Sequence, residues 1–356
     1  MTTPPRRLRR TGGWRVGKDE KGAAGDPKGK LNMQYIDQLE SRRLLASFTA
    51  SSVAELIGDI NAANAAGGAN TITLKAGTAF QLNAVDNSTD GPNGLPVITA
   101  GDNLTIAGNG DTIERSTRKG TPAFRLIDVA FGASLSVNNL TLSRGLAGVP
   151  GFAEGGGIYC MGNLSLVGVT VQNCIAQGGA GLSASGGGIR SGGGVLNIDN
   201  STIQNNEAVG GGGYPDLFFS HPGGSAYGGG LDVGSGTVNI TNTIIFSNLA
   251  RGGDGATSSK RGSYSGSPAR AGDGFGGGIA ASAATVTLRT TTITRNSATG
   301  GASPRGAAVT PTSKGGGLWI GSSSVVGIDA VTLANTSSNS ASTSDDDISG
   351  SFSILA

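Results

Sequence analysis

Aliphatic residues alternate with polar ones along most of the chain, and the alternation recurs in copies of one short pattern. In each copy two aliphatic residues stand two positions apart, and a third follows five positions later. The five clearest copies are Leu164/Leu166 with Val171, Leu196/Ile198 with Ile203, Val238/Ile240 with Ile245, Val286/Leu288 with Ile293, and Val326/Ile328 with Leu333. Because successive side chains of a strand point to opposite faces, each copy predicts short strands with one buried face.

A run of three glycines and an aliphatic residue opens each of these copies. The runs begin at Gly155, Gly186, Gly228, Gly276 and Gly315, so the copies start 31, 42, 48 and 39 residues apart. A repeated unit of period-2 strands predicts a solenoid in which each copy is one coil. Weaker copies extend the pattern back to about residue 70. We therefore expect an all-β fold, a right-handed parallel β-helix of about eight to nine coils.

Stacking of the coils would place equivalent residues over one another, about 4.8 Å apart. Leu196, Val238 and Val286 should then form one inner column, and Ile203, Ile245 and Ile293 another. Asn206, Asn248 and Asn296 should form a structural ladder of amides, with Cys174 and Thr336 at the same position in the first and last copies. On the outer wall we expect Arg190 to pair with Asp232 and to make a cation–π contact with Tyr159.

The chain divides into two regions of opposite charge. Residues 1–47 hold 11 Lys and Arg against 5 Asp and Glu, whereas residues 48–356 hold 15 against 19. The first region predicts a disordered basic tail, and the second the β-helix domain, with its glycine-started repeats at 155–342. A capping-box pattern at Ser52–Glu55 and apolar residues at helical spacing predict a capping helix over about 52–66.

Two stretches resemble known families. Leu39-Glu40-Ser41-Arg42-Arg43-Leu44-Leu45 is similar to the Leu-Glu-Pro-Arg-x-Leu-Leu segment of exported planctomycete proteins, with Ser41 in place of Pro. From residue 51 on, Asn70-Thr71-Ile72-Thr73-Leu74, Asn103-Leu104-Thr105-Ile106 and the glycine-started copies resemble bacterial right-handed β-helix proteins of the pectate-lyase-like superfamily. The choice-of-anchor Q group and the polymorphic outer-membrane-protein repeats are the most similar. The resemblance implies an exported, extracellular or cell-surface protein and implies no particular activity.

The inserts before each next glycine run vary in length while the repeated part does not. They span 180–185, 214–227, 256–275 and 302–314, and inserts in a solenoid gather on one face. We expect that face to bind acidic glycans or cell-surface proteins, because its charges are mainly positive. The candidate ligand-binding residues are Tyr214, Phe218, Phe219, Lys260, Arg261, Tyr264, Arg270, Arg305, Lys314 and Trp319.

An enzyme is the alternative, either a polysaccharide lyase or a glycoside hydrolase. It would need a groove with carboxylates and a Lys or Arg, whereas the outward charges alternate in sign from coil to coil. The single histidine, His221, cannot build a metal cluster alone. We therefore expect no catalytic residue, no metal ligand and no cofactor, with Ca²⁺ at Asp345-Asp346-Asp347 as the weaker alternative to a solvated acidic run.

Three further features are open or negative. Cys160 and Cys174 form either a disulfide, which an exported setting permits, or two buried free thiols. No stretch reaches 18 apolar residues, so no transmembrane segment is expected. The basic run Arg6-Arg7-Leu8-Arg9-Arg10 has no interleaved aromatic residues, so no nucleic-acid partner is expected either.

Overall fold

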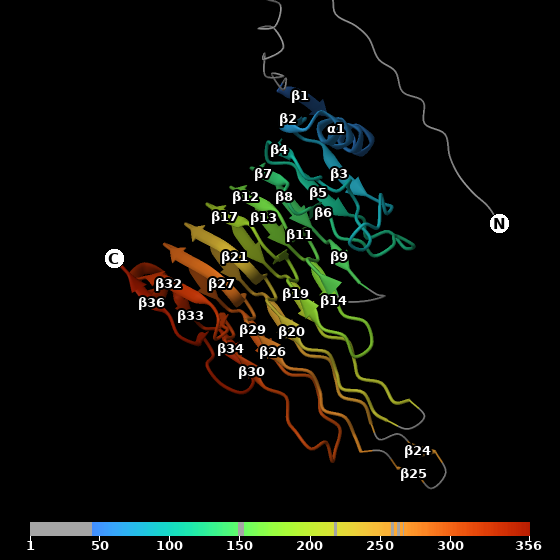
Figure 1. Ribbon diagram of the computed structural model, residues 1–356, viewed down its shortest axis with the longest axis vertical. Helices are drawn as coiled ribbons and strands as arrows, with labels where there is room; N and C mark the ends of the chain where they lie inside the picture. The colour runs from blue at the N-terminus through green and yellow to red at the C-terminus, as the bar shows by residue number, and fades with distance from the viewer. Residues whose placement is uncertain (1–44, 149–152, 217–218, 258–259, 262–263, 266) are drawn as a thin grey trace, which may run out of the picture. The chain divides into compact units, whose positions relative to one another are not determined.

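The computed structural model describes residues 45–148, 153–216, 219–257, 260–261, 264–265 and 267–356, and only the backbone at 260–261 and 264–265. Residues 43–356 form one compact unit. Strands of successive coils pair in parallel, each on the next coil (Figure 1). The parallel β-helix predicted from the repeats is thereby confirmed. The basic tail and most of the export-type segment lie outside the described residues.

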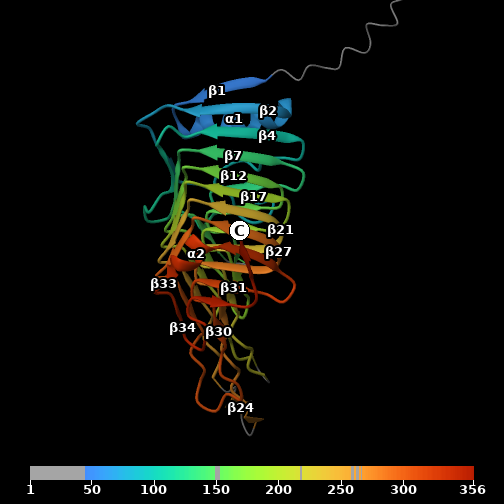
Figure 2. The ribbon, with the colours of Figure 1, turned by 90° about the vertical axis from the view of Figure 1, so that its left-hand side faces the viewer.

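The broad sheet forms one wall, with its strands stacked in register (Figure 2). Its strands are β1 (Ala46–Ala50), β2 (Gly68–Leu74), β4 (Asp102–Ala107), β6 (Ile127–Val129), β7 (Ser134–Asn138), β11 (Ile158–Cys160), β12 (Asn163–Val167), β16 (Ile189–Ser191), β17 (Val195–Asp199), β21 (Leu231–Thr241), β27 (Ile279–Arg289), β31 (Leu318–Ile320), β32 (Val325–Asp329), β35 (Ile348–Ser349) and β36 (Ser353–Leu355).

Three narrower sheets complete the coils, in chain order after the broad sheet. The second sheet holds β3 (Ala79–Leu82), β5 (Thr112–Arg115), β8 (Thr141–Ser143), β13 (Thr170–Gln172), β18 (Thr202–Gln204), β22 (Ile244–Phe246), β28 (Thr292–Thr294) and β33 (Thr336–Ser337). The third holds β9 (Leu146–Ala147), β14 (Ile175–Gln177), β19 (Glu207–Val209), β23 (Leu249–Arg251), β29 (Ser297–Thr299) and β34 (Ser340–Ala341). The fourth holds β10 (Ala153–Glu154), β15 (Ala184–Ser185), β20 (Ala226–Tyr227), β26 (Gly274–Phe275) and β30 (Ser313–Lys314).

The inner columns have the predicted register. Leu196 pairs with Val238 and Val238 with Val286 across β17, β21 and β27, and all three are buried. The column of Ile203, Ile245 and Ile293 runs through the second sheet. A separate cluster of buried alanines, among them Ala176, Ala184 and Ala208, joins strands of the third and fourth sheets. Alanine is small enough to let these two sheets pack closely, where the larger aliphatic residues fill the wider part of each coil.

Helix α1 (Val53–Ala66) is the predicted capping helix. The Ser52 side chain accepts a hydrogen bond from the Glu55 backbone N–H at 3.2 Å, and Glu55 in turn accepts from the Ser51 backbone N–H at 2.7 Å. Leu56, Ile60 and Ala63 are buried in the main core cluster. The helix therefore covers apolar residues of the first coils that would otherwise meet water. Among the described residues no helix is long and apolar enough to span a membrane.

Each glycine run has a distinct role at every position. The first glycine alone has a positive φ, between 60° and 65° in all five runs. A side chain on the second would collide with backbone of the third sheet, as Gly187 would with Glu207. A side chain on the third would press on the Asn ladder, since a Cβ on Gly230 would lie 3.0 Å from Asn248. Left-handed backbone and two close approaches together require three glycines in a row.

The amide ladder forms and is longer than predicted. Asn206, Asn248 and Asn296 are buried, and each passes its backbone and side-chain N–H groups to the Oδ1 of the next member at 2.9–3.0 Å. The last amide is Asn339, which donates to Asp347 Oδ1 at 2.8 Å. The predicted member Thr336 pairs instead with Ile293, in the inner column.

The register predicted for the last copy was therefore wrong by three residues. A short helix, α2 (Ala330–Ala334), occupies the corner where the other coils go directly into the second sheet. The Asp329 side chain caps it by accepting from the Thr332 N–H at 2.7 Å. The extra residues move Leu333 out of the inner column, and it is 37 % exposed.

Candidate functional site

The inserts leave the coils after the third sheet and return to the fourth, and they project away from the core (Figures 1 and 2). At their base, outgoing segments run beside returning ones and form what we call the glycine array: outgoing 178–181, 210–213, 252–255 and 300–302, returning 182–183, 223–225 and 271–273. A chain of backbone hydrogen bonds of 2.8–3.0 Å links the two layers, from Gly301 to Gly272, Gly253, Gly224, Gly211 and Leu182 in turn.

Other bonds of the array link neighbouring coils within one layer. Gly210 donates to the Arg251 carbonyl at 2.9 Å and Gly213 to the Asp254 carbonyl at 2.7 Å, while Gly211 between them donates to the opposite layer. Residues i and i+3 thus share a direction, which is the threefold periodicity of a polyproline-II-like chain. Such a chain has no internal hydrogen bonds, so all of its donors are free to cross-link neighbouring segments.

Only glycine fits at most positions of the array. A Cβ added to Gly211, Gly253 or Gly272 would lie well inside 3.0 Å of backbone atoms of the adjoining segment. Gly212, in the same run, has open space around its Cβ position. The array therefore packs backbone against backbone, and its glycines hold the bases of the inserts in fixed relative positions.

Two groups of predicted ligand-binding residues emerge. Tyr214, Phe219, Arg270 and Arg305 lie on the projecting inserts, as do Lys260 and Arg261 of β24 and Tyr264 of β25 (Tyr264–Ser265), which pair in antiparallel. Phe218 lies outside the described residues. Lys314 and Trp319 lie elsewhere, next to the coils in β30 and β31. The inserts thus separate from the wall that the prediction had combined with them.

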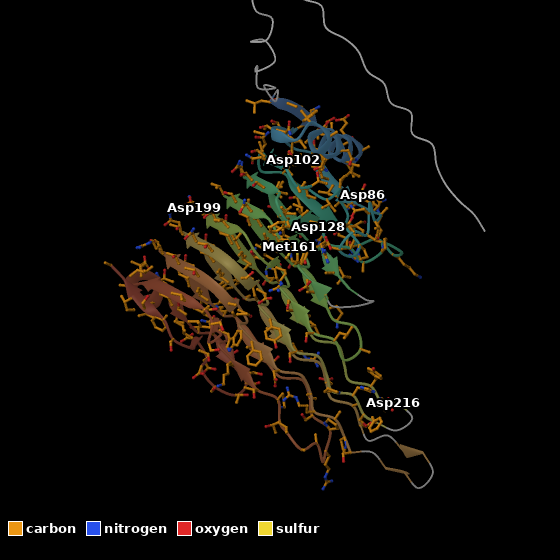
Figure 3. The ribbon with its side chains drawn as sticks, viewed as in Figure 1. Asp86, Asp102, Asp128, Met161, Asp199 and Asp216 are labelled. Atoms are coloured by element: carbon orange, nitrogen blue, oxygen red, sulfur yellow. The ribbon has the colours of Figure 1, made fainter. Side chains whose placement is uncertain are left out.

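The most ordered polar contacts of the insert surface centre on His221. Its ring stacks on Tyr214 with centroids 4.4 Å apart, and its Nε2 lies 2.8 Å from Asp216 Oδ2. Asp216 Oδ1 also accepts from the Phe219 N–H at 2.6 Å. Phe219 is 68 % exposed and Tyr214 42 % exposed. The loop therefore presents two exposed aromatic rings from a hydrogen-bonded turn. Figure 3 places Asp216 far along the inserts from Asp128.

A second set of polar side chains lies where the fourth sheet turns into the broad sheet, and we call it the corner strip. One column of the strip is set by the register of β6, β11, β16, β21, β27 and β31, and the other by that of β10, β15, β20, β26 and β30. The first column contains Asp128, Tyr159, Arg190, Asp232 and Trp319, and the second contains Glu154, Tyr227, Phe275 and Lys314.

Arg190 joins the two columns of the strip. Its guanidinium forms a short ion pair with Asp232, as predicted, and its Nε lies 3.4 Å from Glu154 Oε1. Burial is the main cause that raises the pKa of the Asp232 carboxyl, and the charge of Arg190 opposes it. The cation over the Tyr159 ring is Arg125, 4.8 Å from the ring centre, and not the Arg190 that the sequence suggested.

Arg125 and Asp128 form a buried pair at the N-terminal end of the strip. Arg125 Nη1 lies 3.5 Å from Asp128 Oδ2, which also accepts from Asn93 Nδ2 at 3.2 Å. Burial raises the pKa of Asp128 to about 6, against the opposing charge of Arg125. In the described part of the chain, Asp128 Oδ1, Asp232 Oδ1 and Arg125 Nε have no hydrogen-bond partner. Buried polar atoms without partners are uncommon, and here they gather along one strip.

Three aromatic rings continue the strip toward the C-terminal coils. The centroids of Tyr227 and Phe275 lie 5.4 Å apart, and those of Phe275 and Trp319 5.0 Å apart. All three side chains are partly exposed. Sequence reasoning assigned Trp319 to the inserts and missed Arg125, Asp128 and Glu154. Glu154 immediately precedes a glycine run, so the copy alignment could have found it, whereas Arg125 belongs to a coil without such a run.

Cys160 and Cys174 are both free and buried. Cys160 lies in β11 of the broad sheet, and Cys174 at the corner before β14, where its backbone N–H donates to Asn206 Oδ1 at 2.9 Å. The structure therefore has the two buried thiols and not the disulfide. Burial raises the pKa of each thiol to about 12.

The acidic run Asp345–Asp347 takes part in backbone capping. Asp347 receives the amide ladder, and Asp346 Oδ1 accepts from the Ala341 N–H at 2.7 Å. Within the described ranges no group of three or more His, Cys, Asp or Glu side chains is arranged to hold a metal ion. The carboxylates of this run instead satisfy backbone donors of the last coil.

Comparisons with known proteins add no identity to this description. The chain matches no protein-family model, no curated protein and no solved structure. Its fold and its two candidate sites are therefore argued from its own residues.

Proposed function

We propose that this chain is an exported, extracellular or cell-surface binding protein whose inserts recognise an acidic glycan. The observation that carries the proposal is the glycine array, which joins the bases of successive inserts by backbone hydrogen bonds. A set of loops held in this way presents a preorganised surface, and preorganisation lowers the entropy lost on binding.

Charge supports an anionic ligand. Arg270 is paired with Asp273 at 2.6 Å, so the excess positive charge of the inserts lies on Lys260, Arg261 and Arg305. The rest of the β-helix domain is acidic. A local positive surface on an acidic scaffold attracts polyanions and directs them to the inserts. The exposed rings of Tyr214 and Phe219 supply apolar faces for sugar rings.

Adjacent glycines offer a matched test. Gly211→Ala places a Cβ against the backbone of Gly179, whereas Gly212→Ala places it in open space. Binding of both variants to alginate and polygalacturonate oligomers would be measured by calorimetry, with circular dichroism as the check of folding. We expect Gly211→Ala to weaken binding at least tenfold and Gly212→Ala to leave it unchanged. Equal affinity of the two variants would refute the role of the array.

The same oligomers test the enzymatic alternative. Incubation with the unmodified protein, followed by an assay for unsaturated or shortened products, should release none beyond the buffer control. Product release that is lost in Asp128→Asn or Glu154→Gln would replace the proposal with a lyase or hydrolase.

A further inference from the structure

The corner strip is a second polar surface, separate from the inserts. Its side chains come from the coils themselves, on consecutive coils of two adjoining columns. Neighbouring coils repeat every 4.8 Å or so along the solenoid axis. The strip is therefore elongated, and it runs parallel to that axis from Asp128 to Trp319.

The charges of the strip disfavour a charged ligand of either sign. An anion would face Asp128, Glu154 and Asp232, two of which are already buried carboxylates. A cation would face Arg125 and Arg190, which are held close to those carboxylates. An uncharged ligand avoids both penalties.

The hydrogen-bonding groups of the strip suit hydroxyl groups. Carboxylate oxygens only accept and guanidinium N–H groups only donate, while a hydroxyl does both. Asp128 Oδ1 and Asp232 Oδ1, without partners in the described structure, are acceptors of this kind. The partly exposed rings of Tyr159, Tyr227 and Trp319 add apolar faces beside these groups. Polar groups at fixed positions with aromatic faces beside them are the usual composition of small-molecule sites.

From these features we propose that the corner strip binds an uncharged, polyhydroxylated chain, such as a neutral oligosaccharide, lying along the solenoid axis. Tyr227, Phe275 and Trp319 stack against its rings, and Glu154, Arg190 and Asp232 bond its hydroxyls. This site takes a different ligand class from the inserts, so either site can fail without the other.

Tryptophan fluorescence can report on the strip alone. The chain has two tryptophans, Trp14 and Trp319, so Trp14→Phe leaves the one inside the strip. The Trp14→Phe protein would be titrated with hexasaccharides of β-glucan, xylan and mannan, and with hexagalacturonate as the charged comparison, with calorimetry run in parallel. We expect a saturable response to at least one neutral hexasaccharide and none from Trp319 with the uronate.

Two substitutions in that background decide the assignment. Tyr227→Ala and the conservative Glu154→Gln should each weaken neutral binding at least fivefold, while Tyr214→Ala on the inserts should leave it unchanged. Unfolding midpoints of the variants separate loss of binding from loss of folding, and Glu154→Gln keeps the size of the side chain. The proposal is overturned if calorimetry and fluorescence detect no neutral hexasaccharide at millimolar concentration. It is also overturned if folded Tyr227→Ala and Glu154→Gln bind as tightly as their parent.

Discussion

Asn248 occupies the middle of the amide ladder, where a single substitution breaks several buried hydrogen bonds. Its Oδ1 accepts from the backbone and side-chain N–H groups of Asn206 at 3.0 Å, and its Nδ2 donates to the Ile203 carbonyl and to Asn296 Oδ1 at 2.9 Å. In Asn248→Ala the Asn206 backbone N–H and the Ile203 carbonyl each lose this partner in the interior. At about 1–3 kcal/mol for each buried group, the free energy of unfolding should fall by about 2–6 kcal/mol.

Urea unfolding, followed by circular dichroism with the slope compared between variants, measures this loss. The matched control is Asn239→Ala. Asn239 Nδ2 also donates to an amide on the preceding coil, Asn197 Oδ1 at 2.9 Å, but this pair lies on the exposed face of the broad sheet. The control should change stability by less than about 0.5 kcal/mol. A loss below about 1 kcal/mol in Asn248→Ala, or one no larger than in the control, would refute a stabilising ladder.

Three other predictions concern the core, the thiols and the buried carboxylate. Ile245→Ala truncates an inner column and should lower the free energy of unfolding by about 2–5 kcal/mol, whereas a loss under half a kilocalorie would contradict the column. Because burial raises the pKa of Cys160 and Cys174 to about 12, a thiol reagent at pH 8 should modify neither until the protein unfolds. Burial also raises the pKa of Asp128 to about 6, so between about pH 4 and pH 6 the folded protein holds a proton that the unfolded chain has released. The free energy of unfolding should therefore decrease as pH rises through that interval, and Asp128→Asn should flatten the decrease; an unchanged slope would contradict it.

The inner columns were predictable because they depend on one local rule. Alternation fixes which side chains point inward, and constant spacing within the repeat fixes which of them meet, as for Ile203, Ile245 and Ile293. The same spacing predicted the pair of Arg190 and Asp232. The prediction failed at the last copy because α2 adds residues at one corner. The signal was present, since Asp329 followed by Ala330-Val331-Thr332 is a helix N-cap pattern.

The two candidate sites were harder to predict for different reasons. Arg125 reaches Tyr159 from a coil that the copy alignment did not include, so only the three-dimensional register brings them together. The glycine array depends on contacts between inserts of unequal length, which no alignment places in register. Its signal is nonetheless regular: a glycine pair follows two residues after Ala176, Ala208, Ala250 and Ala298. Paired glycines at constant distance from the core indicate close backbone packing more than variable surface.

The amide ladder also has a direction. Each Asn Oδ1 receives its hydrogen bonds from the preceding coil, and each member donates to the coil after it, so the amide dipoles point the same way along the solenoid. Aligned dipoles leave partial positive charge at the end where the donors point, as at the N-terminus of a helix. That end meets the Asp347 carboxylate, an anion at the positive pole. The parallel β-helix thus acquires in its interior an electrical polarity that its strands, with N–H and C=O groups pointing both ways, would not give it.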